Sequence, residues 1–288
     1  SRVLKYKILL AGDWHSDLHE EAVRRALMEL GQDVVCFPWH QYFKPHQKLE
    51  EILTPILKFQ NKYLVGPKLK NLNEDLVKIF RECKPDVVFI YRGTHIFPET
   101  LAKLKKIRPN SVLVGYNNDD PFAPSQPKWL WRHFRACLPL YDIALAYRNH
   151  NLEDFRRAGA KRVKLLRSWF VPTINRPVNL NEREKDEYGC DVVFVGHFEN
   201  DFRLACLEAV VNEGWNLRLY GHDYGWRKPL SSSRTLRHLL PVKTVWGENY
   251  NKAICGAKIA LCFLSKLNRD SYTRRCFEIP AAGALLMS

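Results

Sequence analysis

Short apolar runs alternate along this chain with longer stretches of helical periodicity, and this alternation restricts the fold more than any other feature. Residues 6–11 form the first apolar run, residues 18–30 carry apolar side chains at helical spacing, and residues 33–37 form the next run. Gly31 stands where such a helix would end, since glycine readily adopts the left-handed conformation of a C-terminal cap. A strand, a helix and a second strand in this order are the unit of a parallel α/β sheet.

The same alternation continues to the end of the sequence, with one interruption. Further apolar runs predict strands at residues 86–91, 111–116, 143–147, 163–166, 191–195, 217–220, 259–264 and 284–287. Stretches with helical periodicity separate them, at residues 47–83, 98–107, 127–138, 151–158, 202–213, 250–255 and 272–282. The interruption is residues 171–189, which contain Pro172, Pro177 and a polar run, as interdomain linkers do.

These patterns predict an α/β protein with two doubly wound, Rossmann-like domains that face a central cleft. The N-terminal domain would cover residues 1–170, the linker residues 171–189 and the C-terminal domain residues 190–288. A length of 288 residues suits two domains, because a domain averages about 150 residues. The strand-like run at 284–287 lies so close to the last residue that we expect the C-terminal domain to be incomplete. Ligands of such sheets bind beyond the carboxyl ends of the strands.

Several common function classes lack their sequence signatures. Neither half carries G-x-G-x-x-G after its first strand, and the chain contains no G-x-x-x-x-G-K-[ST] and no G-x-S-x-G. A dehydrogenase with a classical dinucleotide site, a P-loop NTPase and an ordinary α/β hydrolase are therefore unsupported. The longest apolar runs span six residues, as at 259–264, whereas a membrane-spanning helix needs about 20.

The eight cysteines lie mostly inside apolar runs and form no C-x-x-C pair. Cysteines used in this way behave as small core residues, which is typical of a reducing compartment. We therefore expect a cytoplasmic protein. We also expect no metal site, because no set of ligands has the usual spacing.

The chain is strongly basic: Lys and Arg number 45 against 31 Asp and Glu, a formal net charge of +14. Such an excess favours an anionic partner such as nucleic acid, a phosphorylated ligand or acidic lipid, and solubility is the simpler alternative. Residues 44–80 mix seven lysines with apolar side chains, a pattern typical of a helix on acidic lipid. A peripheral contact with the inner face of a membrane would follow. The same pattern also fits an amphipathic helix packed on the sheet with its lysines in water.

The last helical stretch combines two carboxylates and two adjacent arginines before a turn of small residues. Asp270 and Glu278 are separated by seven residues, a spacing that presents both towards one cleft on a loop followed by a helix. Carboxylates accept hydrogen bonds from the vicinal hydroxyls of ribose and hexose, and the side chains of Arg274 and Arg275 suit a diphosphate. A solvated helix start with an internal ion pair is the structural alternative.

Residues 275–283 resemble the R-x-F-E-x-x-A-x-G signature of CgeB-like (spore maturation protein-like) glycosyltransferases, which have the GT-B fold. Similarity to the same C-terminal domain extends to residues 191–196, Arg203, 219–221 and 247–261. The resemblance covers residues 190–288 well, whereas the N-terminal half is similar mainly in its pattern and at residues 117–121.

The resemblance implies transfer of a sugar from a nucleotide-diphosphate sugar, by default a UDP-sugar, to a glycan, lipid-linked or protein acceptor, as in polysaccharide biosynthesis. It implies no metal and no further cofactor, and it favours retention of the sugar's configuration over inversion. Glu278 would bind the donor ribose. Asp270 stands where many retaining relatives place a glutamate near the donor hexose.

The resemblance also assigns the rest of the donor site. Arg203 and Arg275, with Arg274 beside them, would neutralise the diphosphate. Gly196 would let the phosphates or the acceptor approach the backbone closely. The nucleotide base would lie between Tyr220 and the loop 245–247.

An inverting reaction would need a general base from the N-terminal domain. The candidates follow predicted strands, namely Asp13, His15, His95, Asp119 and Asp120. Each of them could instead be a helix cap or a turn residue.

Two functions of other classes remain open. A GT-B-like module without catalysis would bind glycan or assemble a coat, and it would have a donor site without turnover. Nucleic-acid binding is suggested by the net charge of +14 and an aromatic content of 12%. It is disfavoured because no nucleic-acid-binding motif is present and the basic residues are dispersed along the chain.

Overall fold

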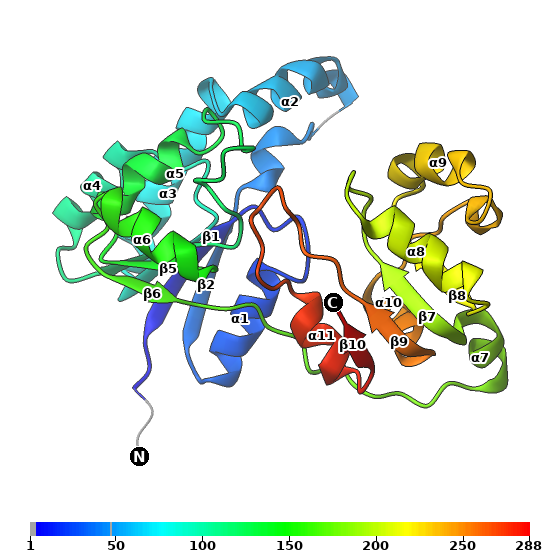
Figure 1. The fold of residues 1–288 in the computed structure, drawn as a ribbon. Helices are drawn as coiled ribbons and strands as arrows, with labels where there is room; N and C mark the ends of the chain where they lie inside the picture. The colour runs from blue at the N-terminus through cyan, green and yellow to red at the C-terminus, as the bar shows by residue number, and fades with distance from the viewer. Residues whose placement is uncertain (1–3, 47) are drawn as a thin grey trace. The chain divides into compact units, whose positions relative to one another are not determined.

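The structure, a computed structural model, describes residues 4–46 and 48–288. The chain divides into two compact units, Ser1–Arg167 and Ser168–Ser288, and each is described by itself (Figure 1). No helix in the described ranges is long and apolar enough to cross a membrane.

The first unit is built on a sheet of six parallel strands in the order β2-β1-β3-β4-β5-β6. Its strands are β1 (Lys7–Gly12), β2 (Asp33–Pro38), β3 (Val87–Tyr91), β4 (Val112–Asn117), β5 (Ile143–Ala146) and β6 (Val163–Leu165). The strand order reverses at β1, which pairs with β2 on one side and with β3 on the other. The carboxyl ends of β1 and β3 therefore form the switch point at which such sheets bind ligands.

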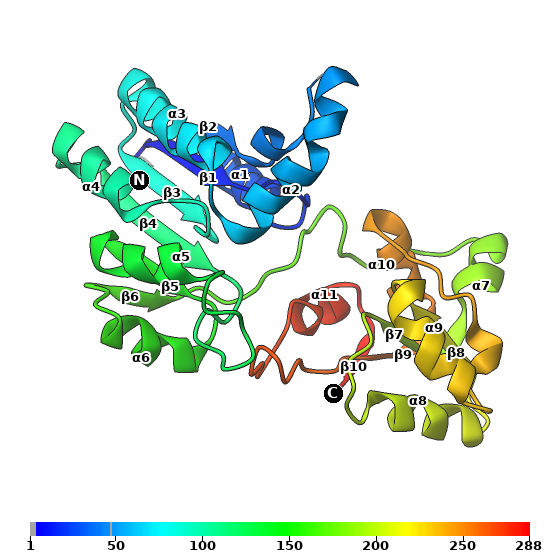
Figure 2. The same ribbon diagram turned by 90° about the horizontal axis from the view of Figure 1, so that it is seen from above.

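Helices connect these strands: α1 (Glu20–Glu29), α2 (Thr54–Tyr63), α3 (Pro67–Cys83), α4 (Pro98–Ile107), α5 (Arg132–Cys137) and α6 (Asn149–Arg157). The 3₁₀ helices η1 (His40–Phe43), η2 (Lys48–Leu53) and η3 (Leu138–Leu140) complete the unit. Figure 2 shows α3 and α4 side by side along the sheet. The buried side of α3 carries Leu69, Leu72, Leu76 and Phe80 at helical spacing, and these pack with Leu9 and other apolar strand residues.

The second unit holds a sheet of four parallel strands in the order β10-β9-β7-β8. The strands are β7 (Cys190–Val195), β8 (Leu217–Tyr220), β9 (Ala257–Leu261) and β10 (Leu285–Met287). The helices are α7 (Glu182–Tyr188), α8 (Arg203–Asn212), α9 (Asp223–Ser232), the 3₁₀ helix η4 (Arg237–Leu239), α10 (Gly247–Cys255) and α11 (Arg275–Ala281). Val193 and Phe194 alternate on β7 and belong to different core clusters, so both faces of this sheet are covered.

The predicted α/β class and the two Rossmann-like domains are confirmed, because both sheets are wholly parallel and helices connect their strands. The central cleft stays a prediction. The segment 171–189, predicted as a linker, lies in the second unit and contains helix α7. Asn181 and Glu184 form a capping box there, a pattern that the polar composition of the segment concealed.

The predicted helical stretch 47–83 divides into η2, α2 and α3. Gln47 lies outside the described residues, and so do the side chains of Lys48, Leu49 and Glu50, which belong to the basic segment 44–80. The break between α2 and α3 comes at Leu64, whose backbone is left-handed, followed by Gly66 and Pro67. Helix α9 was not predicted, because Pro229 interrupts its sequence pattern.

Candidate functional site

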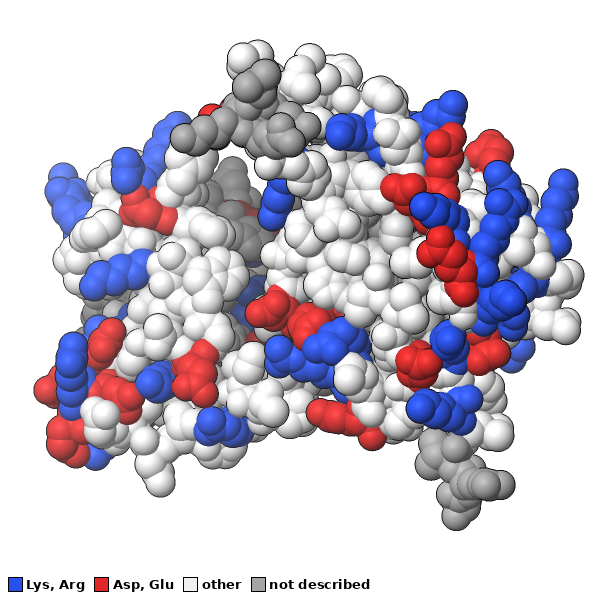
Figure 3. All heavy atoms as spheres, turned by 180° about the vertical axis from the view of Figure 1, so that it is seen from behind, with Lys and Arg blue, Asp and Glu red and all other residues white. Residues whose placement is uncertain are grey.

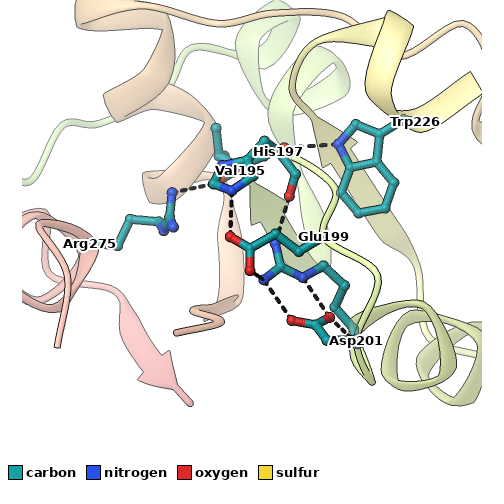
Figure 4. Close-up of polar contacts among 8 residues, drawn as sticks. Val195, His197, Glu199, Asp201, Trp226 and Arg275 are labelled. Atoms are coloured by element: carbon teal, nitrogen blue, oxygen red, sulfur yellow. Dashed lines mark hydrogen bonds and ion pairs between the residues drawn. The ribbon is translucent and has the colours of Figure 1, made fainter. Parts of the chain in front are cut away.

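Gly196 begins the loop that follows β7, and this loop organises the strand ends of the second unit. The Gly196 amide donates to the Tyr220 carbonyl at 2.9 Å. The Gly196 carbonyl accepts from Trp226 Nε1 at 2.9 Å, and Figure 4 labels this tryptophan. A Cβ atom at position 196 would lie 2.7 Å from the Phe194 ring and 3.4 Å from Arg275 Nη1. Glycine is therefore needed where the backbone passes between an aromatic ring and a guanidinium.

Arg203, predicted to bind the diphosphate, is instead fully engaged inside the protein. Its exposed fraction is 1%, and its Nε and Nη2 donate to the two oxygens of Asp201 at 2.8 and 2.9 Å. Nη2 also lies 3.4 Å from Glu199 Oε2, and Nη1 donates to the His197 carbonyl at 2.7 Å. Figure 4 shows this arrangement. Arg203 thus fixes the loop after β7, and these contacts give no support to the prediction that it binds the donor phosphates.

Arg275, at the start of α11, points towards the same loop but has far fewer partners. Its Nη1 donates to the Val195 carbonyl at 3.3 Å (Figure 4), and its guanidinium lies over the Phe194 ring at 6.0 Å. Its Nε is buried and has no hydrogen-bond partner in the part of the chain that the structure describes. A buried donor left unpaired costs free energy, so an anion here would be stabilised. Arg274, one residue earlier, lies 5.4 Å from the Trp169 ring centre.

Glu278 lies one helical turn after Arg274 and Arg275 and is 6% exposed. Among the residues that the structure describes, its carboxylate accepts one long hydrogen bond, from Asn175 Nδ2 at 3.4 Å. Burial raises its pKa above the usual value, and the charges of Arg274 and Arg275 oppose this rise. The Tyr250 hydroxyl is also buried, and none of the described residues forms a hydrogen bond with it. A carboxylate with such unused capacity is suited to accept hydrogen bonds from ligand hydroxyls.

Asp270 lines a cavity of about 660 Å³ beside the end of β9, together with Phe202, Cys262, Phe263, Lys266 and Arg269. Glu278 does not line this cavity. The two carboxylates that the spacing was expected to present to one cleft are thus not brought together in this cavity. Cys262 faces Cys276 with 3.9 Å between their sulfur atoms.

Tyr220, predicted to flank the nucleotide base, is buried in the core of the second unit. Burial raises the pKa of its hydroxyl, and its backbone carbonyl supports Gly196. The predicted loop 245–247 instead presents Trp246, whose exposed ring lies 6.0 Å from that of His222. This exposed indole, directly before α10, lies in the loop that the resemblance assigned to the base.

In the first unit, Asp13 and His15 follow β1 at the switch point and contact each other, with 3.2 Å between Asp13 Oδ2 and His15 Nδ1. Burial alone would raise the pKa of Asp13, but the hydrogen bond with His15 and the charges of nearby histidines lower it. The same hydrogen bond raises the pKa of His15. Buried Glu20 holds the loop by accepting from the Asp13 amide at 3.0 Å. This pair can hold and move a proton at His15.

His95 is buried, and both of its ring nitrogens already have partners. Nδ1 lies 2.8 Å from Thr94 Oγ1 and Nε2 lies 2.7 Å from Asn61 Oδ1. Burial lowers its pKa to about 3, so its ring stays neutral. These contacts give His95 a packing role between Trp39 and Phe43 and do not support the prediction that it is a catalytic base.

Asp120 is also fully buried, and its carboxylate accepts from the Phe122 amide, His150 Nε2 and Asn151 Nδ2 at 2.9–3.0 Å. It therefore ties the loop after β4 to α6, and these contacts do not support its predicted catalytic role. Asp119 forms an ion pair with Arg92 at 2.8 Å. Asp13, His15 and Asp119 all have side chains partly open to solvent. Because Asp119 is paired with an arginine, the Asp13–His15 pair is the one suited to proton transfer. Among the described residues, no three His, Cys, Asp or Glu side chains gather as a metal site would require.

Residues 203–288 match the family model described as "Glycosyl transferase-like". No curated protein matches the chain. The match to the family model begins at Arg203 and includes the cavity, Arg275 and Glu278.

Among solved structures, similarity extends over almost the whole chain. HepE from Anabaena in complex with UDP and glucose is 11% identical, with a TM-score of 0.59 over 98% of this chain and 80% of that one. Sucrose-phosphate synthase from Thermosynechococcus elongatus is 14% identical, with a TM-score of 0.60 over 97% and 80%. A putative UDP-N-acetylglucosamine 2-epimerase from Listeria monocytogenes is 10% identical, with a TM-score of 0.57 over 98% and 78%. This chain has the two-domain GT-B fold, and its residues 203–288 carry the sequence pattern of a glycosyl transferase-like family.

Proposed function

We propose that this protein is a CgeB-like glycosyltransferase that moves a sugar, by default a hexose, from a UDP-sugar to a hydroxyl of a glycan, lipid-linked or protein acceptor. The observation that carries the proposal is Glu278, a buried carboxylate with spare hydrogen-bonding capacity inside the segment that matches the glycosyl transferase-like model. Fold alone would not decide the reaction, because an epimerase shares it. HepE is in complex with UDP and glucose, and the epimerase is named for a UDP-linked sugar. Both similarities support a UDP-sugar as the donor.

In this proposal the donor nucleotide binds the second unit. The Glu278 carboxylate accepts hydrogen bonds from the ribose hydroxyls, and Arg275, with Arg274 beside it, donates to the diphosphate. The Gly196 backbone permits the close approach of the phosphates, and the exposed Trp246 ring offers a stacking surface for the base. Guanidinium groups can stabilise the charge on the departing diphosphate, so the proposal includes no metal and no further cofactor.

The chemistry forms a bond between the acceptor oxygen and the anomeric carbon while the bond from that carbon to the diphosphate oxygen breaks. In a retaining reaction, which we favour, the leaving phosphate takes the acceptor proton. In an inverting reaction, His15 Nε2 would take it, because Asp13 holds the other ring nitrogen. The two reactions therefore differ in whether His15 is required.

We also propose a reducing, cytoplasmic setting, supported by eight cysteines that are all free thiols. Nucleic acid is not part of the proposal. Figure 3 shows basic side chains interspersed with acidic ones over the visible face, whereas a nucleic-acid site would gather them in a stripe.

Replacing Glu278 by glutamine tests the donor site. Glu278→Gln keeps the shape but removes the charge-assisted hydrogen bonds to ribose, so affinity for UDP should fall about tenfold or more by calorimetry. The matched control is Glu213→Gln, an exposed glutamate at the end of α8, which should bind UDP normally. Unchanged UDP affinity in Glu278→Gln would contradict the assignment. UDP-sugar binding without transfer to any acceptor would favour the non-catalytic module instead.

A further inference from the structure

Helix α2 and the turn before it expose a strip of large apolar side chains. Ile52 is 83% exposed, Ile56 54% and Phe59 56%, and Tyr63 is exposed at the end of the helix. Positions 52, 56, 59 and 63 recur at intervals of three and four residues, so they share one side of the helix. We call these four residues the α2 strip. Isolated apolar residues on a surface are ordinary, but an aligned set of this size marks an interaction site.

The other side of α2 is anchored, so the strip cannot turn inward. Leu57, Gln60 and Leu64 are buried. Gln60 Oε1 accepts from the Lys68 amide at 2.9 Å, which joins α2 to the start of α3. Arg132 Nη2 donates to the Leu64 carbonyl at 2.6 Å. These contacts fix the rotation of the helix, and the exposure of the strip is therefore a property of the folded unit. The sequence allowed a helix on lipid or a helix packed on the sheet. The buried side of α2 contacts η1 and α3, and its other side is exposed.

The surroundings of the strip are basic and aromatic. Lys58 and Lys62 are exposed on the next side of the helix, and Lys62 Nζ lies 5.1 Å from the centre of the Tyr63 ring. The Tyr63 ring is 5.2 Å from that of Trp129, which is itself exposed beside Lys128. Glu51 is the only acidic residue between positions 51 and 65.

We propose that the α2 strip docks on the surface of an anionic phospholipid membrane. The apolar side chains would enter the boundary between headgroups and acyl chains, and the lysines would meet the anionic headgroups. Tyr63 and Trp129 are of the residue types that prefer this boundary, because each combines an apolar ring with a polar group. A membrane fits this combination better than a second copy of the chain, whose net charge of +14 would repel the lysines. The contact does not depend on the proposed transfer reaction.

Vesicle flotation with the full chain tests the proposal. The protein should float with vesicles of phosphatidylcholine and phosphatidylglycerol and bind weakly to phosphatidylcholine alone. The double variant Ile56→Ser/Phe59→Ser should lower binding to the anionic vesicles about tenfold or more, because two buried apolar side chains are lost. Lys58→Glu/Lys62→Glu should abolish the preference for the anionic lipid.

The matched control is Met28→Ser/Leu30→Ser, which removes two exposed apolar side chains at the end of α1. This variant should bind vesicles like the unchanged protein. Since Ile56 and Phe59 are exposed, their double variant should also melt at the unchanged temperature, which separates lost binding from lost folding. Equal flotation of the strip variant and the control would overturn the proposal. So would a dimer that the strip variant dissociates while the unchanged protein ignores vesicles, a result that would assign the strip to a second copy.

Discussion

Two arginines approach the same loop of the second unit, and the difference between their surroundings separates structure from ligand binding. Arg203, at the start of α8, is surrounded by Asp201, Glu199 and a backbone carbonyl. Arg275, at the start of α11, donates to a backbone carbonyl, and its buried Nε has no partner among residues 4–46 and 48–288. Both lie in the segment that resembles a nucleotide-sugar site. Burial with a complete set of partners marks a residue that holds the fold, and burial with an incomplete set marks one that can hold a ligand.

The same distinction applies to two histidines of the first unit. Both ring nitrogens of His95 are occupied by protein atoms, whereas His15 has Asp13 at Nδ1 and a side chain half open to solvent. Sequence position made both of them candidates, because each follows a strand. Their hydrogen-bond partners separate them.

The largest expected effect is on stability. Arg203→Ala leaves the carboxylates of Asp201 and Glu199 buried without their cation, so the free energy of unfolding should fall by about 3–5 kcal/mol. Denaturant titration followed by circular dichroism measures this change. A loss below about 1 kcal/mol would show that Arg203 does not hold the loop. Arg203 would then again be a candidate for binding the donor diphosphate.

Arg275→Ala should have a small effect on stability and a large effect on UDP affinity. It removes a long hydrogen bond of 3.3 Å to a backbone carbonyl and, within the described ranges, no ion pair, so stability should change by about 1 kcal/mol or less. Affinity for UDP should fall about tenfold or more, because a charge-assisted contact to the diphosphate is lost. Calorimetry on both arginine variants gives the comparison directly. Normal UDP affinity in Arg275→Ala would remove the distinction drawn between the two arginines.

The smallest expected effect concerns the Asp13–His15 pair. The pKa of His15 is raised above 6.5 in the folded protein, so its contribution to stability is full below pH 6.5 and is lost as pH rises through the folded pKa. Asp13→Asn should return the pKa of His15 towards 6.5, which NMR titration of the imidazole measures. The side chain is half-exposed, so the change in stability should stay below about 1 kcal/mol. An unchanged His15 pKa would show that Asp13 does not hold the ring.

His15 also discriminates between the two reaction courses. His15→Ala should lower transfer by roughly 10²–10⁴ in an inverting enzyme and leave nucleotide binding intact, whereas a retaining enzyme does not need this base. The rate of transfer would follow the titration of His15 in an inverting enzyme and would not follow it in a retaining enzyme.

Much of the fold could be predicted because strand and helix periods are local properties of the sequence. The boundaries of α8 and β7 fall within a residue or two of the predicted 202–213 and 191–195. Helix α7 was not predicted within the segment 171–189, since the capping box that starts it lies in a polar run that also suits a loop. Helix α9 was not predicted either, because it contains Pro229.

The site was harder to predict because partners far apart in sequence decide the role of each residue. Asn175 reaches Glu278 across 103 positions, and Asn61 reaches His95 across 34. Neither contact has a sequence signature. The pairing of Arg203 with Asp201 is local, and the charges at positions 199, 201 and 203 could have suggested it.

The anchored side of α2 has a consequence for the mutations that the chain can accept. Gly66 has a φ of +99°, and a Cβ atom there would lie 2.7 Å from Gln60 Oε1, so folding restricts this position to glycine. Ile56 and Phe59, a few residues away, have exposed side chains that folding does not require. We therefore expect almost any residue at either position to leave the amount of folded protein in a cell unchanged. If evolution retains large apolar side chains at these two positions, the cause would be binding to a partner and not folding. A mutational scan scored once for abundance and once for cellular function would separate the two pressures residue by residue.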